Sequence, residues 1–210
     1  MHILLTDVVT CPRCGPEFGL IVLADRLEDR TVIAGQLGCA NCREEYPIRE
    51  RVADLRTRRT ERSELPPSLP SYDAERGYRL AALLGVTGPS GPIVVDSADR
   101  SLVKEVQRHL PDANVLGVSR GMPREGAGDS MGWLLCDETL PFRSRSLGGI
   151  ALASGDPISL LEEALRTLGR GARVVIDPAP SGVADELLEL GAEVLLQEAM
   201  VAVASDPRAG

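Results

Sequence analysis

The chain has 210 residues, of which 43% are hydrophobic and 26% are charged, and its formal net charge is −8. This composition is typical of a globular protein and excludes an intrinsically disordered chain. An acidic molecule repels a phosphate backbone, so we expect no DNA binding, and no stretch reaches the ~20 apolar residues that cross a bilayer, so we expect no membrane insertion.

Four of the five cysteines form two C-x-x-C pairs, Cys11 with Cys14 and Cys39 with Cys42. Two thiolates at this spacing reach one ion because the backbone between them folds into a tight knuckle, and two knuckles supply the four ligands of a tetrahedral zinc site. Such a site has no open position for a reactive water, so we predict a structural metal.

Three other uses of four cysteines compete with zinc. Disulfides need an oxidising compartment, and the N-terminal segment lacks the features of a secretory signal peptide, so we expect a cytoplasmic protein with reduced thiols. A redox dithiol does not need a second copy of its motif. An iron–sulfur cluster is the third alternative, and the symmetric knuckle spacing favours zinc over it.

The chain around the cysteine pairs is typical of a zinc ribbon, which we place at residues 1–55. We expect two strands at residues 19–24 and 31–37 around a polar turn at 25–30, and an extended piece at 45–48.

The residue after each cysteine pair differs between the two knuckles. Gly15 follows the first pair, where the chain often needs a positive φ angle, and Arg43 occupies the same place in the second pair. We therefore expect the second knuckle to have the less favourable turn.

Residues 56–71 combine charged side chains with three prolines, which predicts an extended linker. The stretch from Arg49 to Arg62 is rich in arginine but also holds acidic residues. A solvated linker is the simpler interpretation of this stretch, and a contact patch for RNA or protein is the alternative.

Strands and helices alternate from residue 72 to the C-terminus. This pattern predicts an α/β fold, with a doubly wound, mostly parallel sheet that has its ligand cleft at the carboxyl ends of the strands. We expect Asp156 to cap the helix that follows it. The predicted helices are 73–84, 99–110, 158–168 and 182–190, and the predicted strands are 92–96, 114–118, 133–136, 149–153, 172–177, 192–197 and 199–204.

The ribbon resembles the Trm-one-twelve family, the small zinc-ribbon activator subunits of tRNA, rRNA and release-factor methyltransferases. The likeness covers the first quarter of the chain and rests on the two cysteine pairs, on Tyr46-Pro47-Ile48 and on the ending Val52-Ala-Asp54-Leu55. Arg51 replaces the glycine that usually follows the Tyr-Pro-Ile turn. The resemblance implies a protein partner from methyltransferase biology.

The remainder resembles a class I S-adenosylmethionine-dependent methyltransferase. The likeness rests on the acid-plus-Leu-Pro-Phe segment at residues 136–142, on the strand at 147–152 and on the helix, turn and strand at 160–175. It implies a Rossmann-like methyltransferase sheet with a reversed edge strand, and S-adenosylmethionine as the cofactor.

The same resemblance implies four cofactor-binding positions, which are Asp96, Ala98, Ser119 and Asp137. Asp96 is the acid after the first strand, but Ala98 and Arg100 replace glycines of the turn that should approach the donor closely. Ser119 replaces the acid that accepts hydrogen bonds from the ribose hydroxyls, and Asp137 is the adenine-side acid. The sequence therefore matches the methyltransferase fold better than it matches the site that should bind the methyl donor.

We expect a noncatalytic zinc-binding scaffold or partner protein, a pseudoenzyme that acts through a protein partner or by self-association. The alternative is an active S-adenosylmethionine-dependent methyltransferase for RNA, protein or a small molecule, in which the ribbon assists acceptor recognition. A third hypothesis gives the ribbon an RNA-binding role. No residue is predicted to be catalytic.

Histidine catalysis is hard to build, because the chain has only His2 and His109. We expect His109 to be solvent-facing at the end of a helix and Cys136 to be a buried apolar residue.

Overall fold

The computed structural model describes residues 2–57, 74–86, 91–123, 132–198 and 201–207. Most of the predicted linker, residues 58–71, lies outside these ranges. No helix within the described ranges is both long and apolar enough to cross a membrane.

The N-terminal region is a short 3-10 helix, η1 (Ile3–Asp7), followed by four antiparallel strands. The strands are β1 (Ile21–Glu28), β2 (Thr31–Gly38), β3 (Glu45–Arg49) and β4 (Val52–Asp54).

The polar turn predicted at residues 25–30 is shorter in the structure, because β1 continues to Glu28. Asp29 and Arg30 form the connection, and both have positive φ angles of 43° and 62°. Glu50 and Arg51 form the second tight connection, with φ angles of 49° and 67°. Two successive positive φ angles are the signature of a type I′ hairpin turn, which usually contains glycine. Charged residues on the exposed strand β1 therefore concealed its length.

The C-terminal region contains the predicted alternation of helices and strands, with bounds that differ by a few residues. The helices are α1 (Ala74–Leu84), α2 (Arg100–His109), η2 (Ile158–Leu160), α3 (Leu161–Thr167) and α4 (Val183–Glu189). The strands are β5 (Ile93–Asp96), β6 (Val115–Ser119), β7 (Trp133–Leu135), β8 (Gly149–Leu152), β9 (Val174–Ile176), β10 (Glu193–Glu198) and β11 (Val201–Ser205).

The strand order in this region is β7-β6-β5-β8-β9-β11-β10. Strands β5 to β9 are parallel to one another, and β11 runs antiparallel to β9 and to β10. The chain moves outward in one direction from β5 to β7 and in the other from β8, so the order reverses between β5 and β8. This is the doubly wound, Rossmann-like α/β fold that the sequence predicts, with a reversed strand near its edge.

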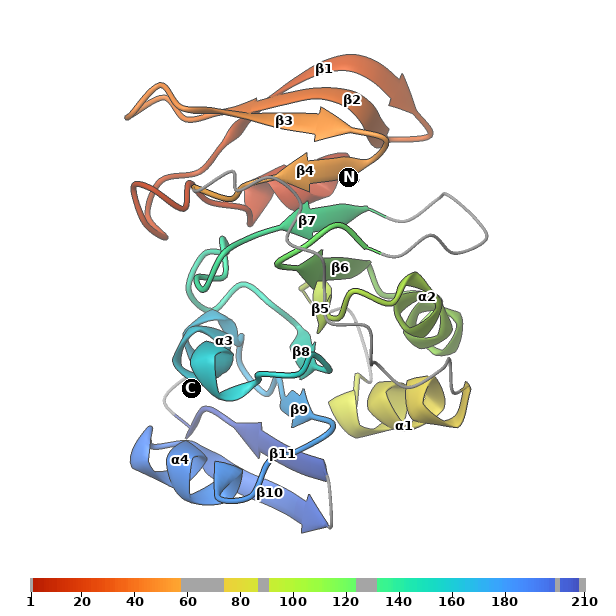
Figure 1. The fold of residues 1–210 in the computed structure, drawn as a ribbon, viewed down its shortest axis with the longest axis vertical. Coiled ribbons are helices and arrows are strands. Elements are labelled where there is room, and N and C mark those ends of the chain that lie inside the picture. The colour runs from red at the N-terminus through yellow and green to blue at the C-terminus, as the bar shows by residue number, and fades with distance from the viewer. Residues whose placement is uncertain (1, 58–73, 87–90, 124–131, 199–200, 208–210) are drawn as a thin grey trace.

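The ribbon and the Rossmann-like region share one sheet of 11 strands, because β4 pairs with β7 in parallel (Figure 1). Ala53 lies opposite Leu134 in this pairing. The ladder extends at both ends, where Trp133 N–H donates to the Arg51 carbonyl at 3.2 Å and Leu55 N–H donates to the Leu135 carbonyl at 2.9 Å. The division into separate domains at residue 55 stays a prediction, and the hydrogen-bonded sheet crosses this boundary.

Helices cover both faces of the parallel strands, with α1 and α2 on one side and α3 and α4 on the other (Figure 1). The alternation within β5 shows why, since Val94 belongs to one buried cluster and Val95 to the other. The cluster of Val94 also contains Leu37 and Leu55 from the ribbon. The ribbon therefore adds its interior to one of the two cores.

One local prediction is wrong. Asp156 does not cap the predicted helix at 158–168, because Pro157 precedes η2 in helical conformation and no side chain caps η2 or α3. His109 is exposed at the last residue of α2, as predicted, and its Nε2 lies 3.1 Å from the Glu105 carboxylate while its ring contacts Tyr78 edge-on. Cys136 is buried, as predicted.

Candidate functional site

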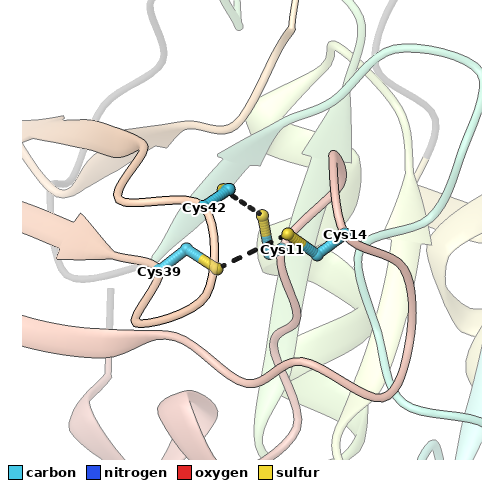
Figure 2. Close-up of side chains that lie close together, drawn as sticks. All are labelled: Cys11, Cys14, Cys39 and Cys42. Atoms are coloured by element: carbon cyan, nitrogen blue, oxygen red, sulfur yellow. Dashed lines mark hydrogen bonds between the residues drawn. The ribbon is translucent and has the colours of Figure 1, made fainter.

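The four cysteine sulfurs converge at one end of the ribbon, and all lie within 4.8 Å of one another (Figure 2). The Sγ atoms of Cys11 and Cys42 are 3.7 Å apart, and those of Cys39 and Cys14 are 3.8 Å apart. Four sulfurs at about 2.3 Å from a central zinc ion would form a tetrahedron with edges of about 3.8 Å. The sulfur arrangement therefore fits a tetrahedral metal ion, and its distances are far too long for disulfides.

The two knuckles have the same backbone fold. Gly15 N–H donates to the Cys11 carbonyl, and Arg43 N–H donates to the Cys39 carbonyl, both at 2.9 Å. Gly15 has a φ angle of 97° and Arg43 one of 60°. The second knuckle thus holds an arginine in the left-handed region, which strains its backbone.

Polar groups around the sulfurs favour the thiolate form, but at Cys11 burial outweighs them and raises its pKa, and the pKa of Cys42 is also raised. Tyr46 lies with its hydroxyl oxygen 3.3 Å from Cys11 Sγ, and the Asn41 side-chain amide donates to Cys14 Sγ at 3.3 Å. Burial raises the pKa of Cys39, but backbone N–H groups of Cys42 and Asn41 outweigh it and lower this pKa to about 7. Deprotonated cysteine is the form that binds metal.

A second group of polar residues lies at the carboxyl edge of the parallel strands. Asp96 ends β5 next to β8, where the strand order reverses, and it is 3% exposed. The Ser154 hydroxyl, which follows β8, donates to one oxygen of this carboxylate. Burial raises the pKa of Asp96 to about 6, although Ser154 and the charge of Arg120 act in the opposite direction.

Ser119, at the end of β6, is committed to bonds within the chain. Its hydroxyl donates to the Gly121 carbonyl at 2.6 Å and accepts a hydrogen bond from the Trp133 indole at 2.8 Å. The indole lies against Gly117, where an added Cβ would meet ring atoms at 2.4 Å. The hydroxyl predicted to face a ribose therefore holds the tryptophan in place.

The turn between β5 and α2 carries the two residues that replace glycine. Ala98 is 3% exposed, and the Arg100 guanidinium lies 5.4 Å from the centre of the Trp133 ring, in a cation–π contact. The space beside this turn therefore holds an arginine on a buried tryptophan.

Asp137 follows β7 and binds the chain that leaves the ribbon. Both the backbone N–H and the hydroxyl of Thr57 donate to the same Asp137 oxygen, at 2.8 Å each. The two residues are 80 positions apart, so nothing in the sequence indicated this contact.

Asp177, after β9, binds two arginines from α1. Arg79 donates to its carboxylate at 2.7 Å, and Arg76 contacts both the carboxylate and the Asp177 carbonyl. Asp177 is 5% exposed, so the pair of arginines compensates a buried charge. The spacing of Arg76 and Arg79 on one helix face was the only available signal for this cluster.

The predicted cofactor residues thus lie along one edge, at or after the ends of β5, β6 and β7, but within the described residues no hydrogen bond joins Asp96, Ser119 and Asp137 to one another. Each has a bond to another residue of the chain instead. Ser119 has no carboxylate, and one oxygen of Asp137 already accepts two hydrogen bonds from Thr57.

The sheet order and the sulfur geometry together define the class of the protein. It is a Rossmann-like α/β domain of doubly wound topology, with a four-cysteine cluster near its N-terminus that is arranged to hold a metal ion.

No protein-family model and no curated protein matches the chain. Among solved structures, it resembles a 1,6-didemethyltoxoflavin-N1-methyltransferase from Burkholderia thailandensis, at 14% identity and TM-score 0.46, over 63% of this chain and 76% of that one. A SAM-dependent methyltransferase from Archaeoglobus fulgidus gives 15% identity and TM-score 0.46 over 58% and 70%. A SAM-dependent O-methyltransferase from Thermotoga maritima gives 13% identity and TM-score 0.47 over 69% and 68%. At these low TM-scores, the fold class rests on the observed strand order.

Proposed function

We propose that the protein is a noncatalytic zinc-binding scaffold or partner protein, whose methyltransferase-like domain does not bind S-adenosylmethionine in the ordinary manner. The observation that carries the proposal is the state of the carboxyl edge. The polar side chains after β5, β6, β7 and β9 already have partners within the chain.

Replacing these internal bonds would cost a ligand much of its affinity. A hydrogen bond to a charged group contributes about 1.5–3 kcal/mol, and a ligand that displaces Thr57 or Ser154 recovers only the difference between the old and new bonds. Arg100 adds a further cost, since a ligand beside the turn must move its guanidinium from Trp133.

The proposed metal is zinc with a structural role. Four cysteine ligands at tetrahedral spacing are the donor set that zinc prefers, and they leave no position for substrate. Bound zinc would hold the knuckle at Cys11 and Cys14 to the knuckle at Cys39 and Cys42. Elemental analysis of the purified protein should give one zinc per chain, and a Cys39→Ser variant should lose most of it.

Exposed apolar residues support an interaction role. Ile21 and Leu23 on β1 are 58% and 53% exposed, and Leu27 is 50% exposed. Monomeric proteins rarely gather large apolar side chains on one exposed strand, so we propose a protein partner or self-association for this strand. Light scattering at increasing concentration distinguishes the two.

RNA binding by the arginine-rich stretch has less support. Arg56 forms a bidentate pair with Asp54, and Arg51 bonds Glu28. Arginines paired in this way contribute less to a phosphate-binding surface. We therefore interpret the arginine-rich stretch as a solvated linker. We propose the cytoplasm as the compartment of the protein.

Calorimetric titration with S-adenosylmethionine tests the proposal directly. We expect no binding up to millimolar concentration in the unchanged protein. An Arg100→Gly variant is the matched control, because it restores glycine in the turn and leaves the other contacts in place. Micromolar binding by the unchanged protein would sink the proposal.

The alternative is an active methyltransferase with an unusual donor pocket. The buried Asp96 favours it, because this carboxylate lies at the point where the strand order reverses, the usual place for a ligand. Methyl transfer to bulk RNA or protein from radiolabelled S-adenosylmethionine would support it, and this activity would have to disappear in Asp96→Ala.

A further inference from the structure

The segment that leaves the ribbon crosses the carboxyl edge of the sheet. We call Leu55, Arg56 and Thr57 the strap. Leu55 is fully buried and extends the β4–β7 ladder by one hydrogen bond, to the Leu135 carbonyl. The strap therefore begins as part of the sheet and reaches the edge where polar residues gather.

Arg56 fixes the direction of the strap. Its guanidinium donates to both oxygens of Asp54 at 2.8 Å, and a third nitrogen reaches the Arg120 carbonyl at 3.4 Å. Arg120 directly follows β6, and its own side chain contacts Asp156 and Ser159. Arg56 thus joins the end of β4 to the loop after β6.

Thr57 ends the described strap on Asp137. Two donors of one residue meet one carboxylate oxygen, and Thr57 itself is exposed. Arg56, in contrast, keeps only 12% of its side chain exposed. The contact at Asp137 is thus local and close to solvent, and it can open while Leu55 and Arg56 stay in place.

We propose that the strap is an autoinhibitory contact, in which Thr57 occupies one oxygen of the Asp137 carboxylate and withholds that oxygen from a small molecule that offers hydroxyl or amino hydrogens. The inference rests on the proposed function, because it names how ligand binding at the same edge is suppressed. Opening the strap exposes Asp137 without moving β7, since β4 remains paired with it.

Two variants open the strap to different degrees. Thr57→Val removes the hydroxyl donor and keeps the backbone donor, and Thr57→Pro removes both. Thr57→Ser keeps both donors and is the matched control. Because Thr57 is exposed, we expect Thr57→Val to fold as the unchanged protein does.

Binding of S-adenosylmethionine and of adenosine to these variants tests the inference, measured by calorimetry. We expect the unchanged protein and Thr57→Ser to show no binding up to millimolar concentration, Thr57→Val to bind with a dissociation constant at least ten-fold below that limit, and Thr57→Pro to bind more tightly still. Adding Asp137→Asn to Thr57→Val should abolish the gain, because the freed carboxylate is lost.

Equal affinities in Thr57→Val, Thr57→Ser and the unchanged protein would overturn the inference. Tight binding by the unchanged protein would instead overturn the proposed function, and the ratio between Thr57→Val and the unchanged protein would still decide the role of the strap. Faster amide exchange at residue 57 in Thr57→Val reports opening independently of any ligand.

Discussion

Two residues, Asp96 and Arg43, are held by the surrounding structure in states that cost folding free energy. Asp96 holds a carboxylate in the interior with one bond from Ser154. Arg43 holds a left-handed backbone angle where the first knuckle has glycine. Both costs are measurable, because a single substitution removes each of them.

Asp96 makes stability depend on pH. Its folded-state pKa of about 6 lies above the ordinary value of 3.8, so the folded protein binds this proton more tightly than the unfolded chain. The resulting stabilisation is complete below pH 4 and is lost as the pH rises through 6. Asp96→Asn has no carboxylate to ionise, so its free energy of unfolding does not fall in this way. The difference in free energy of unfolding between this variant and the unchanged protein should therefore grow by up to about 3 kcal/mol between pH 4 and pH 7.

Urea denaturation at both pH values measures this difference. Asp112→Asn is the control, because Asp112 is exposed in the turn after α2 and is not among the charges that shift the pKa of Asp96. A constant difference between Asp96→Asn and the unchanged protein across this range would contradict the predicted role of burial.

Arg43→Gly should stabilise the protein by about 0.5–1 kcal/mol, because glycine adopts the left-handed angle without strain. Gly15→Ala should have the opposite sign and cost about 1 kcal/mol. No atom lies within 4 Å of an added Cβ at Gly15, so this cost comes from the backbone alone. Chemical denaturation of the zinc-loaded protein measures both, and equal signs would contradict the prediction.

At the scale of elements, the short strand β4 connects the ribbon to the Rossmann-like region. Its three residues pair with β7 and carry the ribbon onto the Rossmann-like sheet. Ala53 in β4 and Leu55 just after it are both fully buried, so the connection is apolar as well as hydrogen-bonded.

Leu55→Ala should destabilise the protein by about 2–5 kcal/mol, the usual cost of emptying a buried leucine site. Because Leu55 belongs to a cluster that spans both regions, ribbon and Rossmann-like signals should shift together in thermal unfolding. Leu23→Ala is the control, since Leu23 is 53% exposed and should cost less than about 0.5 kcal/mol. Two separate unfolding transitions in the unchanged protein would refute the shared core.

The sequence predicted the elements of the Rossmann-like region well, because short apolar strands such as β5 and β8 are buried on both faces and stand out between polar turns. The four cysteines were equally clear, since their spacing alone defines a metal geometry. The pairing of β4 with β7 and the contact of Thr57 with Asp137 join residues about 80 positions apart. No local pattern encodes such contacts. The turn at Glu50 and Arg51 was also concealed, because it lacks the glycine that normally marks such a turn.

At the scale of the whole molecule, the four-cysteine cluster is connected to the central sheet through β3 and β4, so we expect the two to unfold as one cooperative unit. The knuckles tie the start of the chain to the β2–β3 connection, and β3 continues through β4 into the central sheet. A free energy gained at the cysteines therefore stabilises the entire fold.

Removing zinc should lower the melting temperature of the whole protein in a single transition. Circular dichroism with and without a chelator measures it, and restored zinc should reverse the change. Cys136→Ala is the control, because Cys136 is buried but does not belong to the four-cysteine cluster, so the zinc content of this variant should stay unchanged. Loss of ribbon structure alone, with the helices unaffected, would contradict a single unit.

The parallel pairing of β4 with β7 also decides where the sheet ends. With the ribbon in place, the open edges of the described sheet are β1 and β10. Without it, β7 would become an edge strand of sequence Trp-Leu-Leu, which carries neither a charge nor a proline. Natural proteins place charged residues and prolines on their edge strands to avoid aggregation. Zinc in the ribbon would therefore act as a safeguard against aggregation, and metal-free protein should form light-scattering particles through the exposed β7.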